Sequence, residues 1–553
     1  MHKNRVIVAL VMTVLLLLTV SPLWAGGQQA ARTAVVGDRL LAAVPPPPLE
    51  TNRIWASGWA NLAQFEPVLE TLLEINPETG EIQGRLAERW ERRNNDREWV
   101  FFLRRGVQFH HGFGEMTAAD VKHTWELLKR EDSGVNQALV WRNQVSEVEI
   151  IDDHTIAFRF HVPMTFGNQL FSRAGGELYI QSRRHWENEG GEAAVDRRLV
   201  GTGPYFQVER VSGQSMLVRA FDNHWRFRPD DLAFREILFQ YVPDNTTRLA
   251  MLVSGEAHVA EMSRDVAAQA EAQGMRILTS TLENMQRVVM FGGQSFARDD
   301  SGRPTARVND RNHPLSFREV RQAIALAINQ EEIHREIYRG RVAFSHNTGW
   351  HPSREVWNPE WERRFNDFQG YDPARARQLL TQAGFAPGEI NLTVIMTTVP
   401  GQPEARLVTE AIPGYLEAIG INTTIREVDF GTYIPQWQQR NTFDQLFVIR
   451  NLPIRPTEQF IRDQLTYDGA LTFFYTDQFI ADRFAELERE LDGARRNQIS
   501  LEIGNHVFEQ VPFVKLGQTF SEMVVNPNVV ADWVWDGQNP FGPSHWYSIQ
   551  RPR

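Results

Sequence analysis

Apolar residues recur at every second position in several short stretches of the first third of the chain, the pattern of half-buried β-strands. Trp99, Phe101 and Leu103 follow this spacing within residues 98–109, where Arg105-Gly106 separates two apolar halves. The pattern predicts a hairpin there. A second hairpin is predicted over residues 148–160, with its turn at Asp152-Asp153.

Other stretches carry apolar residues along one helix face. Thr117 followed by Asp120 forms a capping box, which predicts that a helix begins there. Asp372 as N-cap and Gly384 just past the end bracket another helix. A helix capped by Ser316 carries a single apolar stripe, formed by Val320, Ala323, Ile324, Ala327 and Ile328.

Strands and helices alternate along the chain. Residues 404–419 are predicted to form a helix that bends near Pro413, and a strand follows directly over residues 421–425. Because the two element types are interleaved rather than segregated, the predicted fold class is α/β.

The N-terminus has the pattern of a secretory signal. A short basic region precedes the apolar run Val6–Val20, and small residues around Ala25 offer a cleavage site. The run has roughly 15 residues, fewer than the about 20 that a membrane-spanning helix needs. We therefore expect a cleaved signal peptide over residues 1–25, with an uncleaved anchor as the alternative, and a proline-rich spacer over residues 26–50.

Composition narrows the function classes. The 553 residues and 63.6 kDa require at least two lobes. A net charge of −11 provides no basic field for nucleic acid, so no nucleic-acid partner is expected. The chain has no cysteine, which excludes disulfides, thiolate metal sites and a lipid-modified cysteine. We expect a free, unlipidated, monomeric periplasmic protein.

A search for reaction chemistry finds no nucleophile elbow, zinc-binding helix or phosphate-binding loop. His110-His111 could begin a metal site, but adjacent side chains point apart and a turn is the better interpretation. Gly201-Thr202-Gly203-Pro204 resembles a phosphate cradle, yet its proline removes a needed N–H, so a tight turn into a strand is favoured. We predict no catalytic residue, no metal and no cofactor.

Several motifs together resemble the family 5 extracellular solute-binding proteins, the oligopeptide-, dipeptide- and nickel-binding components of ABC importers. Their order along the chain, from about residue 65 to residue 525, is more specific than any one motif. The matching segments are residues 84–90, 101–112, 117–121, 201–205, 247–256, 320–328 and 371–385.

This resemblance implies the type II flytrap fold of periplasmic binding proteins, with two lobes and an extra subdomain. Lobe I would comprise residues 51–68, 200–295 and 508–553, the extra α/β subdomain residues 69–199, and lobe II residues 296–507. The implied function is capture of a small solute between the lobes and delivery to a permease with its ATPase at the inner membrane. A secreted carbohydrate hydrolase is the remote alternative.

Candidate ligand-binding residues come from the segments that line the cleft in this family and from loop tryptophans, which stack on sugars or peptide side chains. They are Trp59, Asn61, Trp141, Gln286, Trp437, Arg450 and Asn451.

The class of ligand stays open between a peptide and an oligosaccharide. Peptide binders of this family hold the α-amino group with an aspartate just after a strand that resembles residues 443–454. Here Arg450 stands at the position of a tryptophan in that family, and Leu452, Pro453 and Ile454 cover the place of the aspartate, so no carboxylate is available at that place. An arginine suits hydroxyl, carboxylate or carbonyl oxygens. Alternatively, Glu458 or Asp463 supplies the missing charge from a shifted loop.

Overall fold

The computed structural model describes most of the chain beyond residue 36. The described residues are 37–47, 49–56, 65–135, 137–164, 167–173, 177–292, 296–298, 300, 304–308, 312–352, 356–398, 403–429, 433, 445–451, 457–467, 476–490, 492–537 and 543–553. The predicted signal peptide lies outside them. No helix in this described part of the chain is both long and apolar enough to cross a membrane.

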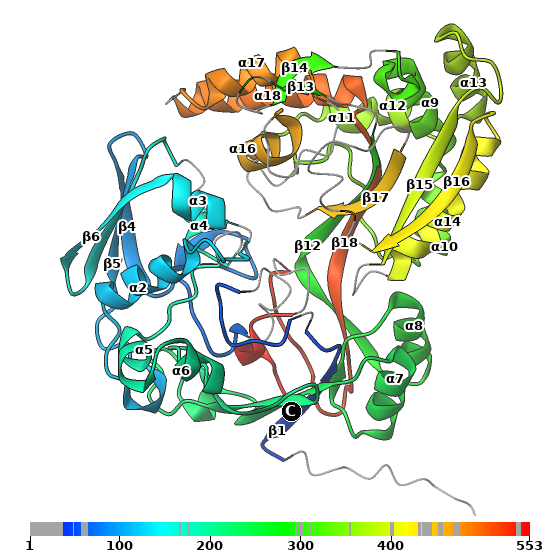
Figure 1. The fold of residues 1–553 in the computed structure, drawn as a ribbon. Coiled ribbons are helices and arrows are strands. Elements are labelled where there is room, and N and C mark those ends of the chain that lie inside the picture. The colour runs from blue at the N-terminus through cyan, green and yellow to red at the C-terminus, as the bar shows by residue number, and fades with distance from the viewer. Residues whose placement is uncertain are drawn as a thin grey trace, which may run out of the picture. The chain divides into compact units, whose positions relative to one another are not determined.

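One ten-stranded sheet organises the molecule (Figure 1). Its strands come from both halves of the sequence, and most neighbours in the sheet are far apart along the chain. In sheet order they are β16 (Asn422–Asp429), β15 (Asn391–Thr398), β17 (Gln445–Asn451), β12 (Arg276–Phe291), β18 (Phe513–Val525), β11 (Val259–Ala260), β1 (Arg39–Val44), β10 (Glu236–Tyr241), β9 (Ser215–Ala220) and β8 (Tyr205–Val211).

Two long antiparallel strands, β12 and β18, connect separate hydrophobic clusters (Figure 1). The larger cluster contains residues 288–291 of β12 and Phe513, Val514 and Leu516 of β18, with helices from the second half of the chain. The smaller cluster packs α7 and α8 against Ala43, Ala260 and Val524 of the sheet. The β12–β18 pair is therefore shared by both cores.

The helices of the larger cluster are α9 (Arg318–Ala327), α10 (Gln330–Glu336), α11 (Glu360–Arg363), α12 (Phe365–Gln369), α13 (Pro373–Gln382), α14 (Pro403–Glu417), α16 (Thr457–Phe460), α17 (Gln478–Leu487) and α18 (Gly493–Gln510). Those of the smaller cluster are α7 (Asn245–Ser254) and α8 (Arg264–Ala272).

A second sheet of four strands has its own aromatic core. Its order is β4 (Ala87–Arg93), β5 (Glu98–Leu103), β7 (Thr155–Phe160) and β6 (Val145–Asp152). Rings of Trp99, Phe101, Trp141 and Phe158 pack around Phe171. The short helices α2 (Ala118–Leu128), α3 (Ala138–Asn143), α4 (Gly167–Leu170), α5 (Arg183–Glu189) and α6 (Glu192–Arg197) lie in this part of the sequence. Two-stranded sheets pair β2 (Leu73–Ile75) with β3 (Ile82–Gly84), and β13 (Phe296–Arg298) with β14 (Pro304–Val308).

Most predicted elements are confirmed, and with them the α/β class. The capping box of α2 is present, Asp372 caps α13, and α14 continues through Pro413. The hairpin over residues 148–160 forms as β6 and β7. Helix α9 begins one residue later than predicted, with Phe317 rather than Ser316 at the N-cap, because Ser316 ends a short 3₁₀ turn.

Two predictions are wrong. The strand at residues 98–103 pairs with β4 and β7 rather than with residues 107–109, because the chain turns there into a short bridge between Gln108 and Glu115. The spacer predicted over residues 26–50 contains β1, which pairs in parallel with β10 and β11. Its run of five apolar residues fills a strand, and the prolines after Val44 end it because they lack an N–H.

A buried ion cluster ties α8 to the β12–β18 pair and to α14. Arg264 at the start of α8 bonds the Glu522 carboxylate of β18 and donates to the Phe520 carbonyl at 3.1 Å. It also lies 3.5 Å from Glu404 of α14, and Arg341 donates to Glu522 at 3.0 Å. Burial raises the pKa of Glu522 although both arginines act to lower it. The cluster links the smaller core to the larger one through charges that are largely removed from water.

Replacing one residue of this ion cluster should destabilise the protein, because the charge that it paired stays buried without a partner. We expect Glu522→Gln to lower the free energy of unfolding by about 3 kcal/mol, since it leaves two arginines without their shared carboxylate. Urea unfolding measures this. Glu427→Gln is the control, because the Arg406–Glu427 pair is half exposed and should contribute little. If both variants lost the same free energy of unfolding, the buried ion cluster would contribute no more than an exposed ion pair, which would contradict the prediction.

Lys515 on β18 is a buried amine in the larger core. Its side chain is 0% exposed and its Nζ has no hydrogen-bond partner. The nearest groups that favour a cation are the rings of Phe508 and Phe365, whose centroids lie 4.7 and 5.8 Å from Nζ. Burial lowers the pKa of Lys515 well below its ordinary value. Folding therefore disfavours the protonated form of this side chain.

Because protonation of Lys515 is coupled to folding, we expect Lys515→Met to raise the free energy of unfolding by an amount that depends on pH. Between the lowered folded pKa and the unfolded pKa of about 10.4, wild-type stability falls by about 1.4 kcal/mol for each pH unit of acidification. The variant escapes this loss, so its advantage should be largest near neutral pH and should shrink as pH approaches 10. Urea unfolding at pH 7, 8.5 and 10 measures the trend. An advantage that does not change with pH would show that Lys515 is charged in the folded protein.

Candidate ligand-binding site

The centre of the large sheet brings together three of the candidate residues, Gln286 on β12 and Arg450 and Asn451 on β17. Gln286 of β12 lies opposite Asn451 of β17 and opposite Gln518 of β18. The next residue along, Arg287, lies opposite Arg450. For Arg450 and Asn451 the structure describes the backbone alone, so their roles in binding stay predictions.

Gln286 is buried without a hydrogen-bond partner. Its side chain is 1% exposed, and neither Oε1 nor Nε2 has a partner. Burying an amide in this state costs about 1–3 kcal/mol for each unsatisfied group. Most buried polar groups in folded proteins are paired, so the unpartnered amide of Gln286 is a candidate for a binding role.

Glu283 is the nearest acid to Gln286 on the same strand. Its Oε2 lies 3.4 Å from Nε2 of His351, and the two side chains are 20% and 22% exposed. Burial by itself would raise the pKa of Glu283, but the contact with His351 outweighs it and the pKa is lowered. The carboxylate therefore stays ionised. Sequence reasoning did not select this residue, and an acid inside a long buried strand is the one signal that could have found it.

The remaining candidates separate into two groups. Trp141 is 0% exposed and packs against Phe158 and Phe171 in the core of the four-stranded sheet. Trp59, Asn61 and Trp437 lie outside the described residues. The structure thus brings Gln286 and Asn451 to one register position and leaves Trp141 elsewhere.

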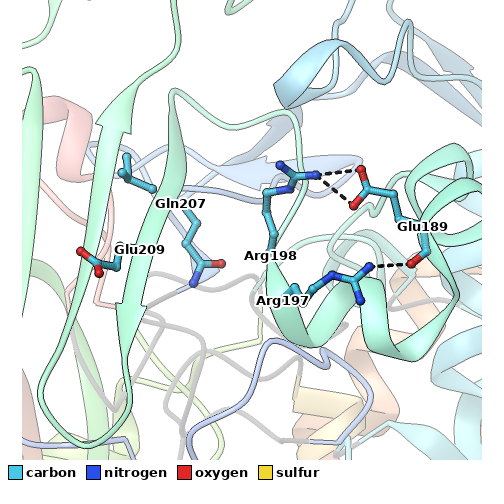
Figure 2. Close-up of a pocket in the computed structure, with 6 residues that line it drawn as sticks. Glu189, Arg197, Arg198, Gln207 and Glu209 are labelled. Carbon is cyan, nitrogen blue, oxygen red and sulfur yellow. Dashed lines mark hydrogen bonds and ion pairs between the residues drawn. The ribbon is translucent and has the colours of Figure 1, made fainter.

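A surface pocket of about 320 Å³ lies away from this region (Figure 2). Glu189, Arg197 and Arg198 line one side, and Gln207, Val208 and Glu209 of β8 line the other. Arg198 donates to the Glu189 carboxylate at 2.8 and 3.0 Å, and Arg197 to its carbonyl oxygen at 2.6 Å. The Glu189 carboxylate is thus paired with Arg198, and five strands separate β8 from β12.

Comparison with known proteins gives the family. The model of the bacterial extracellular solute-binding proteins, family 5, matches residues 81–466, which include β12, β15 and β17. The chain belongs to this family.

Curated relatives and solved structures agree with that assignment. The solute-binding protein is 26% identical over 383 residues to the probable ABC transporter periplasmic-binding protein SapA of Escherichia coli, covering 66% of this chain and 65% of SapA, just under two thirds of its length. It is 25% identical to the E. coli dipeptide-binding protein, covering 69% and 70%. The oligopeptide-binding protein AppA of Bacillus subtilis, solved with a nonapeptide, superposes with a TM-score of 0.70 at 17% identity over 94% of this chain and 99% of AppA. The predicted type II fold is confirmed.

Two motifs considered for chemistry form one structural turn of the solute-binding protein. Gly201 and Gly203 pass so close to Val68 and Pro67 that an added Cβ would lie 2.3 and 2.6 Å from backbone oxygens. The buried His110 ring accepts from the Gly201 N–H at 3.3 Å and contacts the Gly203 carbonyl at 2.9 Å. Burial lowers the pKa of His110 to about 3, so the ring is neutral. No group of three or more potential ligands for a metal occurs among the described side chains.

Glu458 and Asp463 are the two acids that could replace the missing aspartate carboxylate, and Glu458 is already paired. Glu458 accepts from Nε of Arg496 at 3.1 Å and from its Nη2. Asp463 lies in the π-helical turn Ile461–Leu465. A carboxylate held by a guanidinium offers little attraction to a second cation, which leaves Glu458 poorly suited to that role.

The unpartnered Gln286 leads to a stability prediction. Leucine is similar in volume and has no polar atoms, so Gln286→Leu should raise the free energy of unfolding of the ligand-free protein by about 1–2 kcal/mol. Gln369→Leu is the control. That glutamine is also 1% exposed, but its Oε1 accepts from the Lys515 N–H at 3.0 Å, and its loss should destabilise. Destabilisation by Gln286→Leu would indicate that the amide has a structural partner.

Proposed function

We propose that this chain is the substrate-binding component of an ABC importer and that it captures a peptide-class solute beside the β12–β18 pair. The observation that carries the proposal is Gln286, a buried amide without a partner on the strands shared by two hydrophobic cores. Solute-binding proteins hold their ligands between lobes, and a binding group at that junction is unpaired until ligand arrives.

Binding and release require no reaction chemistry. The two strands that join the cores would bend as the lobes close, and closure would exclude water from the solute. The loaded form would dock on a membrane permease with its ATPase. Family membership supports a transport role, and the hydrolase alternative has no supporting observation.

A peptide is the favoured solute class. Two named relatives are a dipeptide-binding protein and a protein solved with a nonapeptide, which supports this class by analogy. The amide of Gln286 also offers one donor and one acceptor side by side, the complement of a peptide group. An oligosaccharide is the second candidate, because residues 443–454 contain Arg450 and no carboxylate after Asp444. Hydroxyl groups would suit both that arginine and a glutamine.

The proposed location is the periplasm. The relative SapA is described as periplasmic, and residues 1–25 have the pattern of a cleaved signal. Because the chain has no cysteine, a lipid anchor on a processed N-terminal cysteine is excluded. The mature chain would begin between Ala25 and Gln28 and act as a monomer.

The test is a thermal-shift screen of the mature chain against mixed di- to pentapeptides and against oligosaccharides. We expect peptides to raise the melting temperature without being consumed, and X-ray scattering to show a smaller radius of gyration with saturating ligand. Arg450→Ala should weaken binding of the solute, whereas Arg426→Ala on the exposed part of β16 should not. Product formation, or an unchanged radius at saturation, would argue against a flytrap binding protein.

A further inference from the structure

We propose that the surface pocket between α6 and β8 binds a small molecule through a carboxylate or phosphate group. The pocket has a volume of about 320 Å³ and is lined by Glu189, Arg197 and Arg198 on one side and by residues 207–209 on the other. Five strands of the large sheet separate β8 from β12. The site is therefore distinct from the proposed solute site, and it does not depend on the proposed transport function.

Arg197, the last residue of α6, brings a positive charge that no carboxylate of the described residues pairs. Its side chain is exposed, and the one hydrogen bond that it donates to a described residue runs from Nη2 to the Glu189 carbonyl oxygen at 2.6 Å. A guanidinium has five N–H donors in a planar fork that matches the oxygens of a carboxylate or a phosphate. Arg197 can therefore donate to an anion without giving up an ion pair.

Arg198 uses only part of its guanidinium in the ion pair with Glu189. Both bonds to that carboxylate, of 2.8 and 3.0 Å, come from Nη2, and Nε is buried without a hydrogen-bond partner. His185 lies 3.6 Å from the same carboxylate, and burial lowers the pKa of this histidine to about 4, so its ring is neutral at pH 7. Two arginines and one glutamate leave this side of the pocket with a net positive charge.

Gln207 of β8 supplies a neutral donor on the opposite side of the pocket. Its side chain is 3% exposed, and its Oε1 accepts from the Leu199 N–H at 2.7 Å. That bond leaves Nε2 as the donor without a partner among the described residues. Figure 2 shows the amide pointing from β8 toward the side that carries the arginines, whereas the Glu209 carboxylate points away from them. A nearly buried donor without a partner is uncommon, and a bound anion would satisfy it.

The charge and the size of the pocket define the class of its ligand. Unused N–H donors on both sides and a net positive charge suit an oxyanion, whereas a cation or an apolar molecule would leave those donors unpaired. A volume of about 320 Å³ is at the lower end of the range for ligand pockets, which indicates a small metabolite. The bond between Leu199 and Gln207 joins the two sides, so little order has to be gained on binding.

Titration of the mature chain with small anions tests the site. The probes are succinate and glycerol 1-phosphate, which carry the two kinds of group, with glycerol as the uncharged control, all at one ionic strength. We expect calorimetry to show saturable binding of at least one anion and no binding of glycerol. Arg197→Gln should weaken that binding at least about tenfold, because it removes a charged donor. Arg375→Gln changes the net charge equally at an exposed position of α13 and should bind like the wild type.

A second variant changes the opposite side of the pocket. Gln207→Glu keeps an oxygen that can accept from the Leu199 N–H but replaces the amide donor with a negative charge, so anion binding should be lost. Melting temperatures without ligand show whether each variant is folded. If Gln207→Glu is not, Arg197→Gln decides alone, because its side chain is exposed and its replacement leaves the core intact.

Binding that is weakened in the pocket variants but not in Arg375→Gln would support the proposal, and the anion that binds identifies the group. No saturable binding of either anion by the wild type would overturn the proposal. Unchanged binding in a folded pocket variant, or an equal loss in Arg375→Gln, would overturn it as well. Each of these failures leaves the transport function standing, because the peptide and oligosaccharide screen tests that function separately.

Discussion

The antiparallel pairing of β12 with β18 is the constraint on which the other parts of the structure depend. The pair runs from Arg276 to Met290 on one strand and contributes side chains to two hydrophobic clusters that otherwise have separate helices. A break in this ladder would detach one core from the other. The irregularities in its register matter for the same reason, because they decide which side chains face which core at the junction.

The sequence predicted the fold better than the site because periodicity reports local burial. The apolar stripe of α9 and the caps of α2 and α13 could be identified from residue spacing. Strand partners cannot be identified in this way, so the predicted partner of β5 and the predicted spacer over residues 26–50 are both wrong. Gln286 was selected through family resemblance. Sequence reasoning did not select Glu283, although an acid inside a long strand is a signal in the sequence.

The preference for arginine over lysine, with only four lysines in the chain, has a structural counterpart in the interior. Arg321 of α9 is fully buried and donates to the carbonyls of Leu315, Ser316, Gln510 and Val511. A guanidinium has five donors in a fixed fork, so it can satisfy several carbonyls where the chain turns. Val511 has a φ of 46°, a rare value for a β-branched residue, and Arg321 holds that turn between α18 and β18.

Chemical modification of Lys515 can report how often the larger hydrophobic core opens. An amine-reactive reagent modifies only amines that it can reach, and the amine of Lys515 is enclosed in the larger core. Lys122 and Lys129 lie on α2 and at its end, where solvent reaches them. They would be labelled at once, while Lys515 would react only when the larger core separates. The rate of its modification, followed by mass spectrometry, would therefore count the opening events of that core in the unaltered protein.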